Sequence, residues 1–150
     1  MFGLFGKRKF HQQVIDMIED MTKTLIVKPN NSEQFKAIEK ELEEAGKAEE
    51  AKNLWPMMVA HAFCAPLDHK EHIDYAYKNF NVRQAAFYSI STYITQISSN
   101  GVLADYKKTE PELYDACKHF WGVCGDAYLT NPEELGCCIM SVEGGGNPFD

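Results

Sequence analysis

Apolar residues recur at every third or fourth position along most of the chain, and this spacing restricts its fold more than any other feature. The first such run comprises Phe10, Val14, Met17, Ile18, Met21 and Leu25. This spacing lines one face of an α-helix, whereas a half-buried strand alternates apolar and polar residues. Because similar runs follow, the sequence predicts an all-α fold, a compact bundle of six to seven short helices.

Prolines and capping residues divide this pattern into separate helices. The first helix should end near Lys28, because the residue before a proline disfavours the helical conformation. Asn31 stands three residues before Gln34, which is the spacing of a capping box at the start of a second helix. That helix should end at Gly46, since glycine accepts the left-handed conformation of a C-terminal cap.

A third helix is predicted over residues 47–65, with a kink or a restart after Trp55. The cause is Pro56, which has no backbone N–H and whose ring clashes with the preceding turn. Asp68 and Glu71 then have the capping-box spacing for a fourth helix.

The segment 86–98 is the one stretch with strand-like composition. It reads AFYSISTYITQIS, and β-branched and aromatic residues are enriched in strands. We nevertheless predict a helix from Val82 to Asn100, because the apolar pattern is long, Asn81 is a suitable N-cap and the neighbouring segments are helical. The strand remains the alternative.

Proline-containing signals open two further helices, one at Thr109 and Pro111 and a short last one at Asn131 and Pro132. The length of 150 residues matches one domain, so residues 1–150 are predicted to form a single helical domain. Within it, residues 1–9 are expected to form a flexible N-terminal segment and residues 143–150 a C-terminal tail.

The net charge limits the classes of partner. The formal charge is −7 and the pI is about 5.2, so the chain as a whole repels nucleic acids and anionic lipids. The only arginines are Arg8 and Arg83, which leaves little guanidinium chemistry for binding phosphate groups. We therefore expect no nucleic-acid partner.

The N-terminal sequence MFGLFGKRKF places apolar residues before basic ones, the reverse of a secretory signal. Phe2, Leu4 and Phe5 with the following cations have the composition of a weak membrane anchor. Packing of this segment onto the bundle is the favoured interpretation, so membrane binding is not expected. No run of 18 apolar residues is present, which predicts no transmembrane helix.

The cysteine content points to a reducing compartment. There are five cysteines, Cys64, Cys117, Cys124, Cys137 and Cys138, and an odd number in a domain of this size favours free thiols. The spacing of seven residues between Cys117 and Cys124 places both on one helical face, where they are interpreted as small buried apolar residues. A cytoplasmic location is predicted.

Histidine supplies the one candidate metal site. His69 and His72 are three residues apart on a predicted helix and so share a face, and His61 lies shortly before them. A metal- or cofactor-binding protein that uses these His or the Cys side chains is therefore one alternative function. No GxSxG, phosphate-loop or GxGxxG motif occurs, so no cofactor is predicted and a non-enzymatic role is favoured.

The leading hypothesis is a non-enzymatic cytosolic protein-binding module, an inhibitor or a toxin-neutralising immunity-type protein that covers a basic surface of its partner. Two groups of residues carry it: the glutamates of an acidic run and two tyrosines that lie off the predicted inward faces. They are Glu39, Glu41, Glu43, Glu44, Glu49 and Glu50 with Tyr75 and Tyr88. A homo-oligomeric structural module, such as a homodimer, is a further alternative.

Overall fold

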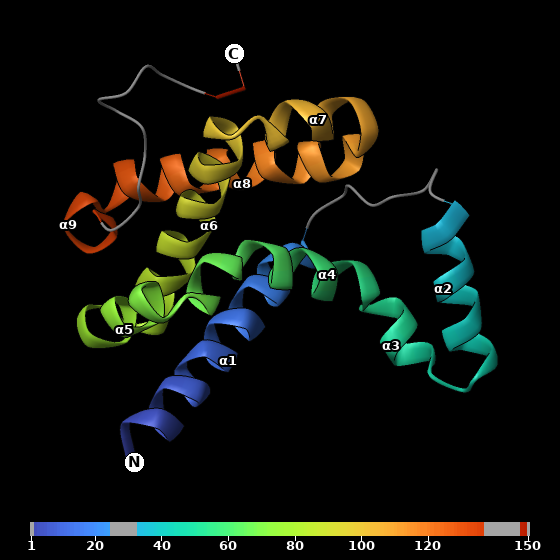
Figure 1. Ribbon diagram of the computed structural model, residues 1–150, viewed down its shortest axis with the longest axis horizontal. Coiled ribbons are helices and arrows are strands. Elements are labelled where there is room, and N and C mark those ends of the chain that lie inside the picture. The colour runs from blue at the N-terminus through green and yellow to red at the C-terminus, as the bar shows by residue number, and fades with distance from the viewer. Residues whose placement is uncertain (1, 25–32, 137–147, 150) are drawn as a thin grey trace.

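The computed structural model describes residues 2–24, 33–136 and 148–149. These residues form helices and no strand, so the predicted all-α class is confirmed for the described part of the chain. In chain order (Figure 1), the α-helices and one short 3-10 helix, η1, are α1 (Phe2–Thr22), α2 (Glu33–Glu44), α3 (Ala48–Lys52), α4 (Leu54–Phe63), η1 (Ala65–Asp68), α5 (Lys70–Asn79), α6 (Val82–Ser99), α7 (Val102–Thr109), α8 (Pro111–Thr130) and α9 (Pro132–Leu135).

Helix α6 is the central element of the bundle. It contacts α1, α4, η1, α7, α8 and α9, and Figure 1 shows it linking the α7–α8 pair to the helices at the N-terminal end of the chain. Every residue from Ala85 to Ile94 is buried, so α6 is enclosed on all sides. Its β-branched and aromatic side chains pack against several helices rather than on a pleated surface. The helix predicted for residues 86–98 is confirmed, and the strand alternative is wrong.

Buried hydroxyl groups in α6 are bonded to backbone carbonyls. Ser89 Oγ donates to the carbonyl oxygen of Phe63 at 2.6 Å, and Ser91 Oγ donates to that of Phe87 at 2.8 Å. Phe63 is the last residue of α4, where carbonyl oxygens have no N–H donor within the helix. Ser89 therefore satisfies the end of α4 and holds it against α6.

Four helices meet at an aromatic cluster around Phe63, whose side chain is fully buried. Its ring lies edge-on to Tyr93 of α6, with centroids 5.0 Å apart, and to Phe120 of α8, with centroids 4.8 Å apart. The hydroxyl oxygen of Tyr93 lies 3.0 Å from that of Tyr106 on α7. Edge-to-face pairs add about 0.5–1.5 kcal/mol each beyond the apolar area that they bury.

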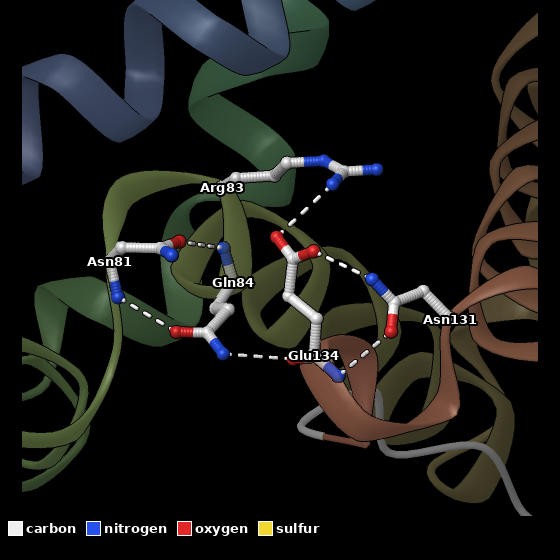
Figure 2. A network of polar contacts seen from close by, with 5 residues as sticks. All are labelled: Asn81, Arg83, Gln84, Asn131 and Glu134. Atoms are coloured by element: carbon white, nitrogen blue, oxygen red, sulfur yellow. Dashed lines mark hydrogen bonds and ion pairs between the residues drawn. The ribbon is translucent and has the colours of Figure 1, made fainter.

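The two predicted asparagine caps are confirmed, and one polar network joins them (Figure 2). The Asn81 side chain accepts from the Gln84 amide at 2.8 Å, and the Gln84 side chain accepts from the Asn81 amide at 3.0 Å. The Asn131 side chain accepts from the Glu134 amide at 3.3 Å. Glu134 also pairs with Arg83 at 3.1 Å, and its carbonyl oxygen accepts from Gln84 Nε2 at 2.8 Å. The network fixes α9 to the first turn of α6.

The predicted break near Pro56 occurs earlier than expected. Instead of one helix over residues 47–65 that restarts after Trp55, α3 ends before Asn53 and α4 begins at Leu54. Pro56 thus occupies the first turn of α4, where amides have no intrahelical acceptor and a missing N–H costs little. The proline is compatible with the helix that it was expected to interrupt.

Residues 2–9 belong to α1, and a contact of 2.7 Å between Lys7 Nζ and Asp74 Oδ1 connects this part of α1 to α5. The expected flexibility of residues 1–9 stays a prediction. One further expectation is wrong, and one helix was not predicted. Asp68 does not cap α5, because the N-cap position is His69, whose side chain makes no capping hydrogen bond. The helix α7 had no predicted counterpart, since Leu103 is its only buried residue and gives little periodic signal.

The C-terminal tail predicted for residues 143–150 is described only at residues 148–149. There the ring of Phe149 packs against α8, with centroid distances of 5.4 Å to Tyr114 and 6.4 Å to Trp121. This part of the tail therefore lies on the bundle. Other predictions lie outside the described residues: the helix end at Lys28, the cap at Asn31, and the thiols Cys137 and Cys138.

Truncation of the aromatic cluster should weaken the whole fold. We expect Phe63→Ala to lower the free energy of unfolding by about 3–5 kcal/mol, because it leaves a cavity where α4, α6 and α8 meet. Urea denaturation followed by circular dichroism measures this change. Phe5→Ala is the control, since that ring is 64% exposed and its removal should leave the stability unchanged. Equal effects of the two substitutions would contradict the assignment of Phe63 to the core.

The linked caps should behave as one unit. Asn81→Ala and Asn131→Ala should each cost about 1 kcal/mol of stability. The double variant should cost less than their sum, because Gln84 of one cap and Asn131 of the other both bond Glu134. The control pair is Asn81→Ala with Asn100→Ala, at opposite ends of α6, for which the same measurement should give additive losses. Additivity in both pairs would show that the network is not coupled.

Candidate functional site

The glutamates predicted to contact a partner lie on two consecutive helices of the structure. Glu39, Glu41, Glu43 and Glu44 belong to α2, and Glu49 and Glu50 belong to α3. All are exposed except Glu39, which is half-buried. None of the six forms an ion pair with another described residue. Their charges are therefore available to a partner.

Three of these carboxylates occupy an unfavourable position for the helix itself. Glu41, Glu43 and Glu44 lie in the last turn of α2, which contains no basic residue. The carboxyl end of a helix carries partial negative charge and is stabilised by cations rather than by anions. Helix stability therefore does not explain why negative charge is concentrated at this end.

We call residues 33–52 the acidic arm. With seven glutamates and four lysines it carries a formal charge of −3. Gly46, at φ 77°, ends α2 as the sequence predicts and turns the chain back into α3. Figure 1 shows α2 apart from the main bundle, and its principal contacts are with α3. The arm is an appendage rather than a layer of the bundle.

The acidic arm has a small apolar contact of its own. The main core contains none of its residues, although Phe35 and Ala51 are both buried. Phe35 packs edge-on against Trp55 of α4, with ring centroids 6.2 Å apart, and Trp55 in turn packs against the main core. Trp55 thus joins the arm to the bundle.

Exposed apolar side chains lie close in sequence to this contact. Ile38, one helical turn after Phe35, is 39% exposed, and Met57 and Met58, within one turn of Trp55, are 41% and 46% exposed. The buried side of α4 is formed by Leu54, Val59, Ala60 and Phe63, and the two methionines lie on its exposed side. We call the three exposed apolar residues and the six glutamates the arm surface.

The two tyrosines predicted as partner contacts have different environments. Tyr75 is 52% exposed, as expected. Tyr88 is only 7% exposed, so its assignment to a binding surface is wrong. Its ring packs near Tyr75 and Phe80, and its hydroxyl oxygen lies 2.9 Å from His72 Nδ1. Tyr88 lies off the face deduced from periodicity, but α6 is buried on every face and therefore encloses it.

The histidines do not assemble a metal site among the described residues. The rings of His69 and His72 are 6.1 Å apart, and His72 contacts the Tyr88 hydroxyl. His61 lies on the exposed face of α4. No group of three or more His, Cys, Asp or Glu side chains that could hold a metal ion occurs in the described ranges. The metal hypothesis gains no support from this geometry.

Cys64, Cys117 and Cys124 are buried free thiols, as the sequence predicts. Burial raises the pKa of Cys117 to about 12. The pKa of Cys64 is also raised, mainly by burial and to a smaller extent by the negative charge of Asp68. A thiol must ionise to act as a nucleophile or a metal ligand. At neutral pH Cys64 and Cys117 therefore behave as small apolar residues.

Comparison with known proteins finds no family model, no curated protein and no solved structure that matches this chain. Among the described helices, none combines the length and the apolar character needed to cross a membrane.

The buried thiols predict that stability falls at alkaline pH. Because the pKa of Cys117 is raised on folding, its contribution is complete below the unfolded value near 9 and is lost as pH rises toward about 12. In that window each such thiol should lower the free energy of unfolding by up to about 1.4 kcal/mol per pH unit. Urea titrations between pH 8 and 11 test this slope. It should be shallower in Cys117→Ala, and an unchanged slope would contradict the prediction.

Proposed function

We propose that this chain is a non-enzymatic cytosolic protein-binding module, and that its arm surface docks onto a cationic amphipathic segment of a partner. The observation that carries the proposal is the combination of unpaired carboxylates on the acidic arm with exposed methionines on α4, within one turn of the Trp55 ring that joins the arm to the bundle. The binding would act by occlusion, as in an inhibitor or an immunity-type protein, because the arm surface offers contact area rather than a reactive group.

The chemistry of the arm surface suits a helix with basic and apolar faces. Methionine side chains are flexible and polarisable, so Met57 and Met58 can adapt to the apolar side chains of a partner. The carboxylates of the acidic arm attract lysine or arginine of a partner, which raises the association rate and penalises acidic partners. The carboxylates at the end of α2 should bind a partner's cation most strongly, because that cation would also offset the partial negative charge of the helix terminus.

The described residues do not specifically favour the other functions considered from the sequence. The described histidines form no group of three metal-ligating side chains. The metal-binding role and the homodimer therefore remain predictions from the sequence.

A designed peptide tests the proposal directly. The probe is a synthetic amphipathic helix of lysine and leucine, with a glutamate-for-lysine peptide as its counterpart, and its affinity for the full chain is measured by calorimetry. Carbon-labelled methionine methyl groups report where it binds by NMR. We expect the signals of Met57 and Met58 to shift with the cationic peptide only.

Charge-matched variants separate docking from general electrostatics. The variant Glu41→Gln/Glu43→Gln/Glu44→Gln should weaken binding about tenfold at low salt, since three rim charges at about 0.5 kcal/mol each correspond to that factor. The control Asp105→Asn/Asp115→Asn/Asp126→Asn removes the same charge from exposed positions on α7 and α8 and should change affinity less than twofold. Equal loss in both variants, or no shift of the methionine signals, would falsify the assignment.

A further inference from the structure

A second feature lies on the bundle, away from the acidic arm. A solvent-exposed pocket of about 420 Å³ lies between the N-terminal half of α1 and the segment η1–α5. Cations and carboxylates line it together with two apolar side chains, Leu67 and Ile73. The proposed protein-binding role uses none of these residues.

Three Lys or Arg side chains and two carboxylates, Asp68 and Asp74, line this pocket, which leaves a formal charge of +1 with His11 neutral. Asp74 accepts from Lys7 at 2.7 Å and from Lys70 at 2.5 Å, so one carboxylate serves two ammonium groups. Those two hydrogen bonds lower the pKa of Asp74 and keep its carboxylate ionised, and the bond from Lys7 has the larger effect. Arg8 also lines the pocket and forms no ion pair with any described residue. An unpaired guanidinium beside two shared ammonium groups is a site for an anion.

The pocket wall also holds a polar atom without a hydrogen bond. His11 Nε2 is shielded from solvent and has no hydrogen-bond partner among the described residues. It lies 3.4 Å from Asp68 Oδ1, close enough for electrostatic attraction but not placed for a hydrogen bond. Because solvent does not reach this nitrogen, it lies behind the pocket surface, and its electrostatic partner is the Asp68 carboxylate.

We infer that this pocket binds a phosphate monoester carried on an apolar body. A phosphate monoester has several oxygens and up to two negative charges, so it can contact Arg8 and the two lysines at once, whereas a carboxylate offers only one charge. Arg8 and Lys7 come from α1 and Lys70 from α5, so the cations converge from two helices. Ile73, which is half-buried in the pocket lining, provides the apolar surface against which the apolar body would lie.

Such a group can come from a soluble metabolite or from a phospholipid headgroup. Phe5 lies three residues before Arg8 on α1, so the two share a helical face, and its ring is 64% exposed. A lipid source would use this ring in the acyl region beside the headgroup site. A soluble source would not need it.

The test uses the full chain labelled with nitrogen-15 and two probes at constant ionic strength. The first is glycerol 3-phosphate, titrated against chloride as the reference anion and followed by amide NMR shifts. The second is a set of phosphatidylcholine vesicles with and without phosphatidic acid, followed by co-sedimentation. Arg8→Gln removes the unpaired guanidinium. Lys9→Gln is the matched control, because it removes the same charge from an exposed position on the same helix that does not line the pocket.

We expect saturable glycerol 3-phosphate shifts confined to α1, η1 and the start of α5, weakened at least tenfold by Arg8→Gln and less than twofold by Lys9→Gln. If Phe5→Ser removes binding to phosphatidic acid vesicles but leaves glycerol 3-phosphate binding intact, the lipid is the source. If the wild-type chain does not co-sediment with phosphatidic acid vesicles, the phosphate ligand is a soluble metabolite. Absence of saturable shifts at this pocket, or equal loss in Arg8→Gln and Lys9→Gln, would overturn the inference.

Discussion

The packing of Phe63 between Tyr93 and Phe120 holds together the parts of this fold that the local sequence cannot join. Phe63 ends α4, Tyr93 lies in the middle of the enclosed helix α6, and Phe120 lies on α8, so one cluster connects segments distant along the chain. The carbonyl group of Phe63 is also bonded by Ser89. Apolar burial and a satisfied helix end thus act at the same residue, and the remaining helices pack around that centre.

This centre also explains why the acidic arm can carry unfavourable charge. Phe35 and Trp55 attach the arm outside the main core. Repulsion from the carboxylates at the end of α2 therefore destabilises only the arm and not the bundle. Regions with few buried contacts open at lower free energy than the core does, and binding surfaces are often drawn from them. The arm can therefore be adapted to a partner without loss of the bundle.

The charge of the chain is distributed unevenly, and its net value conceals this. The formal charge of −7 predicts repulsion of anions, yet Lys7, Arg8 and Lys70 converge on one pocket of the bundle. The acidic arm and this cationic pocket lie on different elements. Local fields decide what each surface attracts, because charges more than about 10 Å apart are largely screened at physiological salt.

Local sequence was enough to predict the helical class, the caps at Asn81 and Asn131, the helix end at Gly46 and the buried thiols Cys64, Cys117 and Cys124. These follow from periodicity, backbone conformation and side-chain chemistry over a few residues, all of which are local. Helix packing, which the local sequence does not show, buries Tyr88, leaves the arm outside the core and brings together cations from α1 and α5. Those facts depend on which helix faces cover one another, and residues far apart in the chain set that arrangement.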